Sequence, residues 1–275
     1  MNNRIDSQFL TEKLINAGIE ANEAKKEISI LLDELTDVYK IDEIINERIK
    51  FRTPIQYLLG KAYFMDFEVK VNNNVLIPRP ETELLVEETV KKIKKIMFSQ
   101  FSALDVGTGS GIIPVALAKL IPELEITGVD IERDITELAA YNAQINNVCE
   151  NIKFKICDLF SKSFEDLLAI NKFDLIISNP PYVKENELKN LKPEVYLHEP
   201  KIALCGSREN KTGLIYYERI FQLINKRSNI KLLAFEIDPP LVKNLIKILE
   251  KYTLNKFELV KDYSKLDRFL FVYLN

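Results

Sequence analysis

The sequence is short of the residues on which several kinds of site depend. Its 275 residues include one histidine and no tryptophan, and none of its three cysteines (Cys149, Cys157 and Cys205) forms a Cys-x-x-Cys pair. A mechanism that needs two histidines is therefore excluded. The cysteine spacing indicates neither a disulfide framework nor a zinc site. We expect no metal, and we interpret the cysteines as small buried apolar side chains.

The sequence also lacks long apolar runs and an excess of charge of one sign. No segment approaches the roughly 18 apolar residues that a membrane span needs. The first residues, MNNRIDSQF, do not resemble a signal peptide, so we expect a cytoplasmic protein with no membrane partner. With 38 basic and 41 acidic residues, the net charge is −3, and no global positive field attracts nucleic acid.

Up to about residue 60 the apolar residues recur at helical spacing and predict four helices. Gly18 is expected to end the first helix and Gly60 the fourth. The fourth is predicted to begin with Thr53 as its cap and Pro54 at the first helical position, with Gln56 completing a capping box. A small helical bundle, structural or used for docking, is expected here.

The rest of the chain predicts a hairpin and then a sheet. Alternating residues followed by an asparagine-rich turn indicate a hairpin linker over residues 61–77, which separates domains at 1–60 and 78–275. The predicted strands are 103–106, 125–129, 153–156, 173–178, 232–237, 257–260 and 268–273, and the helices are 81–97, 112–120, 134–146, 214–225 and 241–251. This alternation predicts an α/β fold with a doubly wound, mostly parallel sheet. The last two strands have no helix between them, so they should pair antiparallel at an edge.

A glycine-rich loop joins the first of these strands to a helix. It contains Gly107, Thr108, Gly109, Ser110 and Gly111. Glycines at such a junction allow a tight turn and close approach of a ligand to the free N–H groups of the helix. A dinucleotide loop would read G-x-G-x-x-G, but Ile112 stands where the third glycine would be. The spacing favours a smaller nucleoside ligand and argues against a nicotinamide dehydrogenase.

Two acids follow the next strands at corresponding places. Asp130 lies about 20 residues past the glycines, where an acid can accept from ribose hydroxyls. Asp158 follows the third strand, where it can accept from an exocyclic amine such as that of adenine. Each acid alone is as well explained as a strand-end or helix-capping residue. Because ligands of open α/β sheets bind beyond the carboxyl ends of strands, the three features together favour one nucleoside site.

The fourth strand ends in Asn179, Pro180, Pro181 and Tyr182. In isolation this is a proline-rich turn. At a ligand-binding edge it suits the methylation of a planar NH2 group, whose lone pair is delocalised. The Asn179 side-chain oxygen and the Pro180 carbonyl, held rigid by Pro181, can accept from the two N–H bonds and stabilise the developing positive charge. Tyr182 supplies an aromatic face. The product proton can pass to water, so no histidine base is needed.

At this point the chain resembles the release factor glutamine methyltransferases, which use S-adenosylmethionine. The resemblance extends almost from end to end. It is carried by RTPIQYLLG (52–60), PRPETE (78–83), the glycine loop, N-P-P-Y (179–182), and Glu199-Pro200 followed by Ala203-Leu204. The family's fold is a seven-stranded Rossmann-like sheet with an antiparallel edge strand and a small N-terminal helical domain. Its members methylate the amide nitrogen (N5) of the glutamine in the GGQ motif of peptide chain release factors.

The resemblance also implies roles for individual residues. Residues 107–111 would line the methionine and ribose of the cofactor, Asp130 would hold the ribose, and Asp158 with Leu159 would border the adenine. Residues 179–182 would bind the glutamine amide, with Asn179 also next to the cofactor. The N-terminal helices would help to dock the protein substrate. Catalysis is expected from Asn179, Pro180 and Tyr182, in a monomer.

Some features depart from the family pattern or stay open. The end of the fifth strand reads Glu236-Ile237-Asp238-Pro239-Pro240, without the usual glycine, and a usual Gly-x-x-Arg becomes Lys265-Leu266-Asp267-Arg268. The loop 205–212 is long. Arg79, Glu81 and Glu83 either gate the cofactor or simply begin a helix.

Two rival functions remain open beside this one. An adenine N6 or guanine N2 methyltransferase would share N-P-P-Y, but it would be expected to have a basic surface or a target-recognition domain. A non-catalytic protein that binds adenosylmethionine or a nucleotide is the other rival. We expect no direct nucleic-acid substrate.

Overall fold

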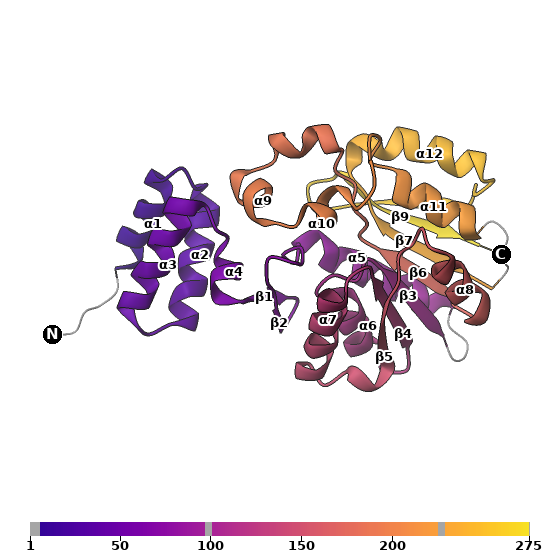
Figure 1. Ribbon diagram of the computed structural model, residues 1–275, viewed down its shortest axis with the longest axis horizontal. Coiled ribbons are helices and arrows are strands. Elements are labelled where there is room, and N and C mark those ends of the chain that lie inside the picture. Colours follow the sequence, from indigo (N-terminus) through magenta and orange to yellow (C-terminus); the bar gives the residue numbers. More distant parts are fainter. Residues whose placement is uncertain (1–5, 97–100, 225–228, 275) are drawn as a thin grey trace. The chain divides into compact units, whose positions relative to one another are not determined.

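The computed structural model describes residues 6–96, 101–224 and 229–274. They fall into two compact units, drawn in Figure 1. The helical unit comprises Met1–Gly60 and Lys192–His198, and the sheet unit comprises Lys61–Leu191 and Glu199–Asn275. The chain therefore leaves the sheet unit after Leu191, contributes a short segment to the helical unit, and returns at Glu199.

The helical unit contains the four predicted helices. They are α1 (Ser7–Asn16), α2 (Ala21–Glu34), α3 (Val38–Phe51) and α4 (Ile55–Leu59). Asp6, Glu20 and Asp37 cap the first three by accepting from backbone N–H groups. Leu14, Leu31 and Ile45 lie at the centre of its core and are fully buried.

The predicted ends of these helices are only partly correct. Gly18 and Gly60 both adopt left-handed backbone angles at the ends of α1 and α4, as expected. The predicted cap of α4 is wrong. Pro54, in an extended conformation, is the cap residue, and among the described residues no side chain caps this helix. Arg52 already ends α3 in a left-handed conformation, so Thr53 falls within the tight turn between the two helices.

The helical unit is completed by α9 (Pro193–His198). The guanidinium of Arg48, which is 1% exposed, donates to Glu27 at 2.9 Å and to Glu194 of α9 at 3.0 Å. His198 Nε2 lies 2.7 Å from the carbonyl oxygen of Phe51. A buried arginine therefore joins α9 to the helical unit through charge-assisted hydrogen bonds.

The sheet unit is built on one seven-stranded sheet with the order β5-β4-β3-β6-β7-β9-β8. The strands are β3 (Ser102–Val106), β4 (Glu125–Asp130), β5 (Ile152–Ile156), β6 (Leu175–Ser178), β7 (Leu232–Glu236), β8 (Phe257–Lys261) and β9 (Asp267–Tyr273). The first five in this order pair in parallel, and β9 pairs antiparallel with both β7 and β8. The predicted α/β sheet and its antiparallel edge are confirmed.

Helices cover both faces of the sheet (Figure 1). On one face, α5 (Pro80–Ile96), α6 (Ile112–Leu120) and α7 (Arg133–Ile145) contact each other in turn and the strands beneath them. On the other face, α8 (Lys162–Ile170), α11 (Ile215–Ile224) and α12 (Val242–Lys251) share one buried core with the sheet. The sequence did not predict α8. The predicted helix ends at Met97 and Asn225 lie outside the described residues.

Short elements complete the sheet unit. They are α10 (Lys201–Cys205) and the 3-10 turns Cys149–Asn151, Glu185–Asn190 and Pro239–Leu241. The predicted hairpin is formed by β1 (Lys61–Phe64) and β2 (Phe67–Lys70), which pair antiparallel. Buried Asn142 connects β2 to the glycine loop. Its Oδ1 accepts from Lys70 N, and its Nδ2 donates to Lys70 O and, at 2.8 Å, to Ser110 O. Among the described residues, none of the helices has the length and apolar character needed to cross a membrane.

Candidate active site

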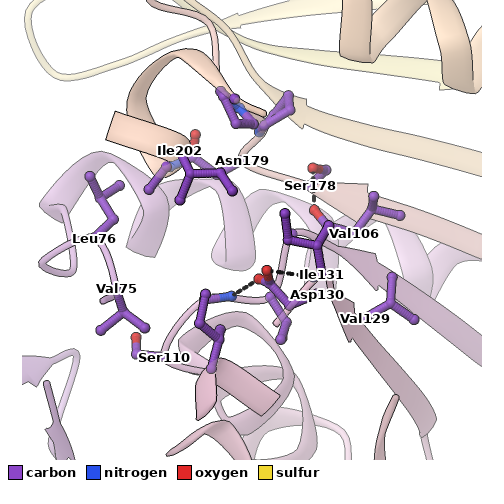
Figure 2. A pocket seen from close by; sticks show the side chains of 18 of the residues that line it. Val75, Leu76, Val106, Ser110, Val129, Asp130, Ile131, Ser178, Asn179 and Ile202 are labelled. Atoms are coloured by element: carbon purple, nitrogen blue, oxygen red, sulfur yellow. Dashed lines mark hydrogen bonds between the residues drawn. The ribbon is translucent and has the colours of Figure 1, made fainter. Parts of the chain in front are cut away.

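A pocket lies in the sheet unit where β3, β4, β5 and β6 end. Its lining comes from residues 74–79 with Thr82, from the glycine loop and the start of α6, from the ends of β4, β5 and β6, and from α10 and α11. In Figure 2, Asp130 and Ser110 lie toward one end of this pocket, and Asn179 and Ile202 toward the other. We call these the loop end and the acceptor end.

The loop end is shaped by the glycine loop. The N–H groups of Gly107 and Thr108 donate to Val129 O at 2.9 and 3.0 Å, which folds the loop against the end of β4. Gly111 has φ +80°, and a Cβ there would lie 3.0 Å from the Cβ of Ala139, so no other residue fits without strain. Gly107, Thr108, Gly109 and Ser110 line the pocket, whereas Gly111 is not among its lining residues in the described chain.

Asp130 lies beside the glycine loop. One carboxylate oxygen accepts from Gly109 N at 2.9 Å and the other from Ile131 N at 2.8 Å (Figure 2). Burial raises the pKa of Asp130 above its ordinary value, and the two N–H donors act against that shift. The structure therefore places Asp130, the first of the two predicted acids, at the loop end, with its carboxylate oriented by backbone groups.

Asp158 and Leu159 also line the pocket, just after β5. Asp158 Oδ1 accepts from Phe160 N at 2.8 Å, and Oδ2 lies 3.3 Å from the guanidinium of Arg208. That guanidinium stands 4.5 Å above the ring of Phe160. Arg208 belongs to the loop whose length was noted in the sequence, but nothing in the sequence connected it with Asp158.

The N-P-P-Y motif divides between the pocket and the core. Asn179, Pro180 and Pro181 line the acceptor end; Tyr182 is not among the lining residues of the described chain. Its ring packs against the hydrophobic core, and its hydroxyl lies 3.5 Å from Glu236 Oε1. Burial raises the pKa of Tyr182 above its ordinary value. The backbone after the prolines is held closely, since a Cβ on Gly213 would lie 2.5 Å from Tyr182 O.

Asn179 is connected to two buried residues that the sequence did not single out as site residues. Its Nδ2 donates to Thr82 Oγ1 at 3.2 Å, and Thr82 Oγ1 donates to Glu236 Oε2 at 2.6 Å. Thr82 is on α5, and Glu236 is the last residue of β7. Burial raises the pKa of Glu236 to about 7. Thr82 lies within the family motif PRPETE, and Glu236 is the first residue of a segment that departs from the family pattern. The resemblance was therefore the only feature of the sequence that could have pointed to these two residues.

The other residues of PRPETE have separate partners. Arg79 lines the pocket and donates to both carboxylate oxygens of Glu199, at 2.6 and 2.7 Å. Glu199 is 4% exposed, and its burial raises its pKa while Arg79 opposes that shift. Glu83 accepts from Met65 N at 2.7 Å and so holds the hairpin. Arg79 therefore belongs to the pocket wall and Glu83 contacts the hairpin, and a gate formed by Arg79, Glu81 and Glu83 stays a prediction.

Asp105, in β3 directly before the glycine loop, is fully buried. Among the described residues, neither of its carboxylate oxygens has a hydrogen-bond partner. Burial raises its pKa to about 7, the neighbouring Thr108 hydroxyl opposes that shift, and the charge of Asp130 adds to it. In the described part of the chain, no group of three or more His, Cys, Asp or Glu residues is arranged to hold a metal ion.

The geometry fits a nucleoside with a charged tail. Gly107, Gly109 and Gly111 all have positive φ, which favours glycine in this loop, Asp130 and Asp158 lie at the ends of neighbouring strands, and an amide lies at the opposite end of the pocket. This arrangement suits a cofactor bound along the strand ends with its reactive group directed toward Asn179.

Comparisons with known proteins agree with this geometry. Residues 98–230 match the family model described as "Methyltransferase domain". The release factor glutamine methyltransferase of Fusobacterium nucleatum is 34% identical over 96% of this chain and 71% of that protein. The one of Bacillus subtilis is 35% identical over 95% of this chain and 93% of that protein.

A solved structure with a similar fold is the hMettl16 catalytic domain in complex with MAT2A 3'UTR hairpin 6. Its TM-score is 0.59 at 14% identity, over 86% of this chain and 81% of that one, and this likeness shows the fold alone. The methyltransferase class, its Rossmann-like fold and its S-adenosylmethionine cofactor, all expected from the sequence, are confirmed. With identity at this level over nearly the whole of this chain and more than two thirds of each relative, the chain belongs to the release factor glutamine methyltransferase family.

Proposed function

We propose that this protein transfers a methyl group from S-adenosylmethionine to the side-chain amide nitrogen (N5) of the glutamine in the GGQ motif of peptide chain release factors. The observation that carries the proposal is the position of Asn179. In a chain of this family, its amide lies at the acceptor end of the pocket and is held by a hydrogen bond to buried Thr82. An amide is the group that a planar NH2 substrate can pair with.

The cofactor is proposed to bind along the loop end. The residues present fit it: Gly107 to Ser110 and Asp130 line the part of the pocket where its ribose and methionine part would lie, and Asp158 with Leu159 line the part where its adenine would lie. When bound, S-adenosylmethionine supplies a methyl group on a positively charged sulfur.

The chain's own residues are proposed to orient and stabilise the glutamine amide. Asn179 Oδ1 and the Pro180 carbonyl accept from its two N–H bonds, which favours the positive charge that develops on nitrogen as the methyl arrives. Pro181 fixes the backbone that carries the Pro180 carbonyl. The methylated nitrogen then loses a proton to water, so no side-chain base is required.

We keep Tyr182 as a proposed aromatic contact of the substrate, as the family motif implies, although it is not among the residues that line the pocket in the described chain. Its ring is anchored on the hydrophobic core, and this supports the backbone of the motif. A contact between this ring and substrate would involve the edge that is left half-buried.

The helical unit is proposed to dock the release factor. It carries exposed aromatic side chains, of which Phe9 and Tyr39 are 62% and 86% exposed, and such residues suit protein contacts. We place the protein in the cytoplasm, where translation terminates, and propose that it acts as a monomer on a protein substrate. No feature of the described residues favours the rival nucleic-acid substrate.

The test is mass spectrometry of an unmethylated release factor after incubation with S-adenosylmethionine and either the wild-type protein or Asn179→Ala. The expected result is one added methyl group on the GGQ glutamine with the wild type. With Asn179→Ala, we expect turnover to fall by about 100-fold or more, since an acceptor aimed at the developing charge is lost. Cofactor binding should change by less than about threefold, because the loop end is intact. Methylation of RNA or DNA instead of the release factor would overturn the proposal.

A further inference from the structure

We propose that Thr82 and Glu236 are positioning residues that fix the side-chain amide of Asn179 with its oxygen, and not its nitrogen, available to the substrate. Together the three residues form a relay from the end of β7, through α5, to the acceptor end of the pocket. The proposal rests on the proposed function, in which Asn179 must accept a hydrogen bond from an NH2 group.

The orientation follows from which groups can donate. An ionised carboxylate can only accept, so the 2.6 Å contact between Thr82 Oγ1 and Glu236 Oε2 uses the single hydroxyl proton of Thr82. Toward Asn179, Thr82 then has only lone pairs to offer. The amide atom 3.2 Å from Thr82 Oγ1 must therefore be the Nδ2 donor, and Oδ1 is turned away from Thr82. The two ends of an amide are chemically distinct here, although they are nearly equal in shape.

Burial makes the relay selective. Thr82 is 1% exposed and Glu236 is 2% exposed, so water cannot take the place of either partner. If Asn179 turned over, its oxygen would face the lone pairs of Thr82 with no proton between them, and a buried polar group would lose its partner. Glu236 is itself held in place, because Tyr217 donates to its backbone carbonyl at 2.8 Å.

The fixed orientation has a consequence for the substrate class. A glutamine amide meets an acceptor and can donate to it. A glutamate carboxylate of nearly the same shape meets the same oxygen and is repelled, and a site built for one hydrogen-bonding partner rejects an isostere that lacks it. The relay therefore selects NH2 donors without any charged residue touching the substrate.

The first arm of the test does not depend on activity. In full-length protein labelled with 15N-asparagine, the Asn179 side-chain pair is the signal missing from Asn179→Asp. We expect one of its protons to be shifted downfield by the bond to Thr82, and the shift to disappear in Thr82→Val and to persist in Thr82→Ser. A pair that is unchanged in Thr82→Val would overturn the relay.

The second arm measures kinetics with the matched control Thr89→Val. Thr89 is also a fully buried threonine of α5, but its hydroxyl donates to Leu85 O within the helix. We expect Thr82→Val to lower kcat/KM for the release factor by about 10- to 100-fold while cofactor Kd stays within about threefold, since only orientation is lost. Thr82→Ser should recover most of the rate, and Thr89→Val should leave it unchanged.

The outcomes separate the relay from the proposed function. Equal losses in Thr82→Val and Thr89→Val, or a loss of rate that merely follows a loss of cofactor binding, would mean a structural role and overturn the relay. If wild-type protein leaves the release factor unmethylated, the proposed function fails. The amide signals still decide in that case whether Thr82 orients Asn179.

Discussion

Two buried carboxylates at the two ends of the pocket, Asp105 and Glu236, differ in what surrounds them. Burial raises the pKa of each to about 7. Among the described residues, Asp105 has no hydrogen-bond partner, whereas Glu236 accepts from Thr82 and lies near the Tyr182 hydroxyl. Burial thus raises both pKa values, but the two groups differ in role. Asp105 keeps its proton to a higher pH beneath the loop end, whereas Glu236 orders the hydrogen bonds of the acceptor end.

The largest effect should come from replacing the unpartnered carboxylate. A pKa raised from 3.8 to about 7 means that the folded state holds a proton that the unfolded state releases, so stability falls as pH rises through that window. Asp105→Asn removes this dependence. We expect its gain in the free energy of unfolding over wild type to be roughly 2 to 3 kcal/mol greater at pH 8 than at pH 5.

The measurement is urea unfolding of wild type and Asp105→Asn at both pH values. The exposed Asp33→Asn is the control, and it should show no such dependence. A gain of Asp105→Asn that is the same at pH 5 and pH 8 would show that Asp105 is not the group that titrates in this range.

The second prediction concerns the methylation rate, which should depend on pH through Glu236, whereas Asp105 makes stability depend on pH. Protonated Glu236 can donate to Thr82, which reverses the relay and leaves Asn179 without its required orientation. The rate should therefore fall as pH drops below about 7, by about tenfold for each further unit. The charge of Glu81 raises the pKa of Glu236, and the charges of Arg268 and Arg79 lower it. The neighbouring hydroxyls of Tyr182 and Tyr217 stay protonated in this pH range, since their own pKa values are raised.

The check is the pH profile of kcat/KM for the release factor between pH 5.5 and 8.5. In Glu236→Gln, whose side-chain oxygen can still accept from Thr82, the acid limb near pH 7 should disappear. In Asp105→Asn it should stay. The reverse pattern would assign the titration to the loop end and remove the distinction between the two carboxylates.

The smallest predicted effect is on the free energy of unfolding and comes from an uncharged residue. Thr253, just past α12, has φ +56°, which is unfavourable for a β-branched residue. Thr253→Gly should raise the free energy of unfolding by up to about 1 kcal/mol, because relief of this strain exceeds the entropy cost of glycine. Unlike the Asp105 effect, the gain should be the same at pH 5 and pH 8. Thr253→Ala is the matched control and should fall between the two, and a glycine variant less stable than wild type would contradict the prediction.

Much of the fold could be predicted because it depends on local patterns. Periodicity located the helices of the helical unit, the strands of the sheet and its antiparallel edge. Helix α8 was missed, although α6, which is also nine residues long and lies between two strands, was predicted. The cap of α4 was misplaced because the left-handed Arg52 cannot be recognised from sequence. Lys265, which stands where the family pattern has glycine, has a positive φ of 63°.

The candidate site could be predicted only for residues whose position is set by the local sequence, at the ends of predicted strands. The glycine loop, Asp130 and Asp158 each lie at a strand end, and parallel strands bring such ends to one edge. The relay could not be predicted. Asn179 is 97 positions from Thr82, and Thr82 is 154 from Glu236, so only the folded sheet unit brings them together. The same holds for Arg208 and Asp158.

The contribution of Lys192–His198 to the helical unit bears on how this protein can be divided. The chain passes between the two units three times, after Gly60, after Leu191 and after His198. A truncation after Gly60 would thus not separate two modules. It would separate α9 from Arg48 and leave the carboxylate of Glu194 without its buried partner. The helical unit is therefore formed by two separate segments of the chain, and the sheet unit cannot be isolated, exchanged or fused at a single junction.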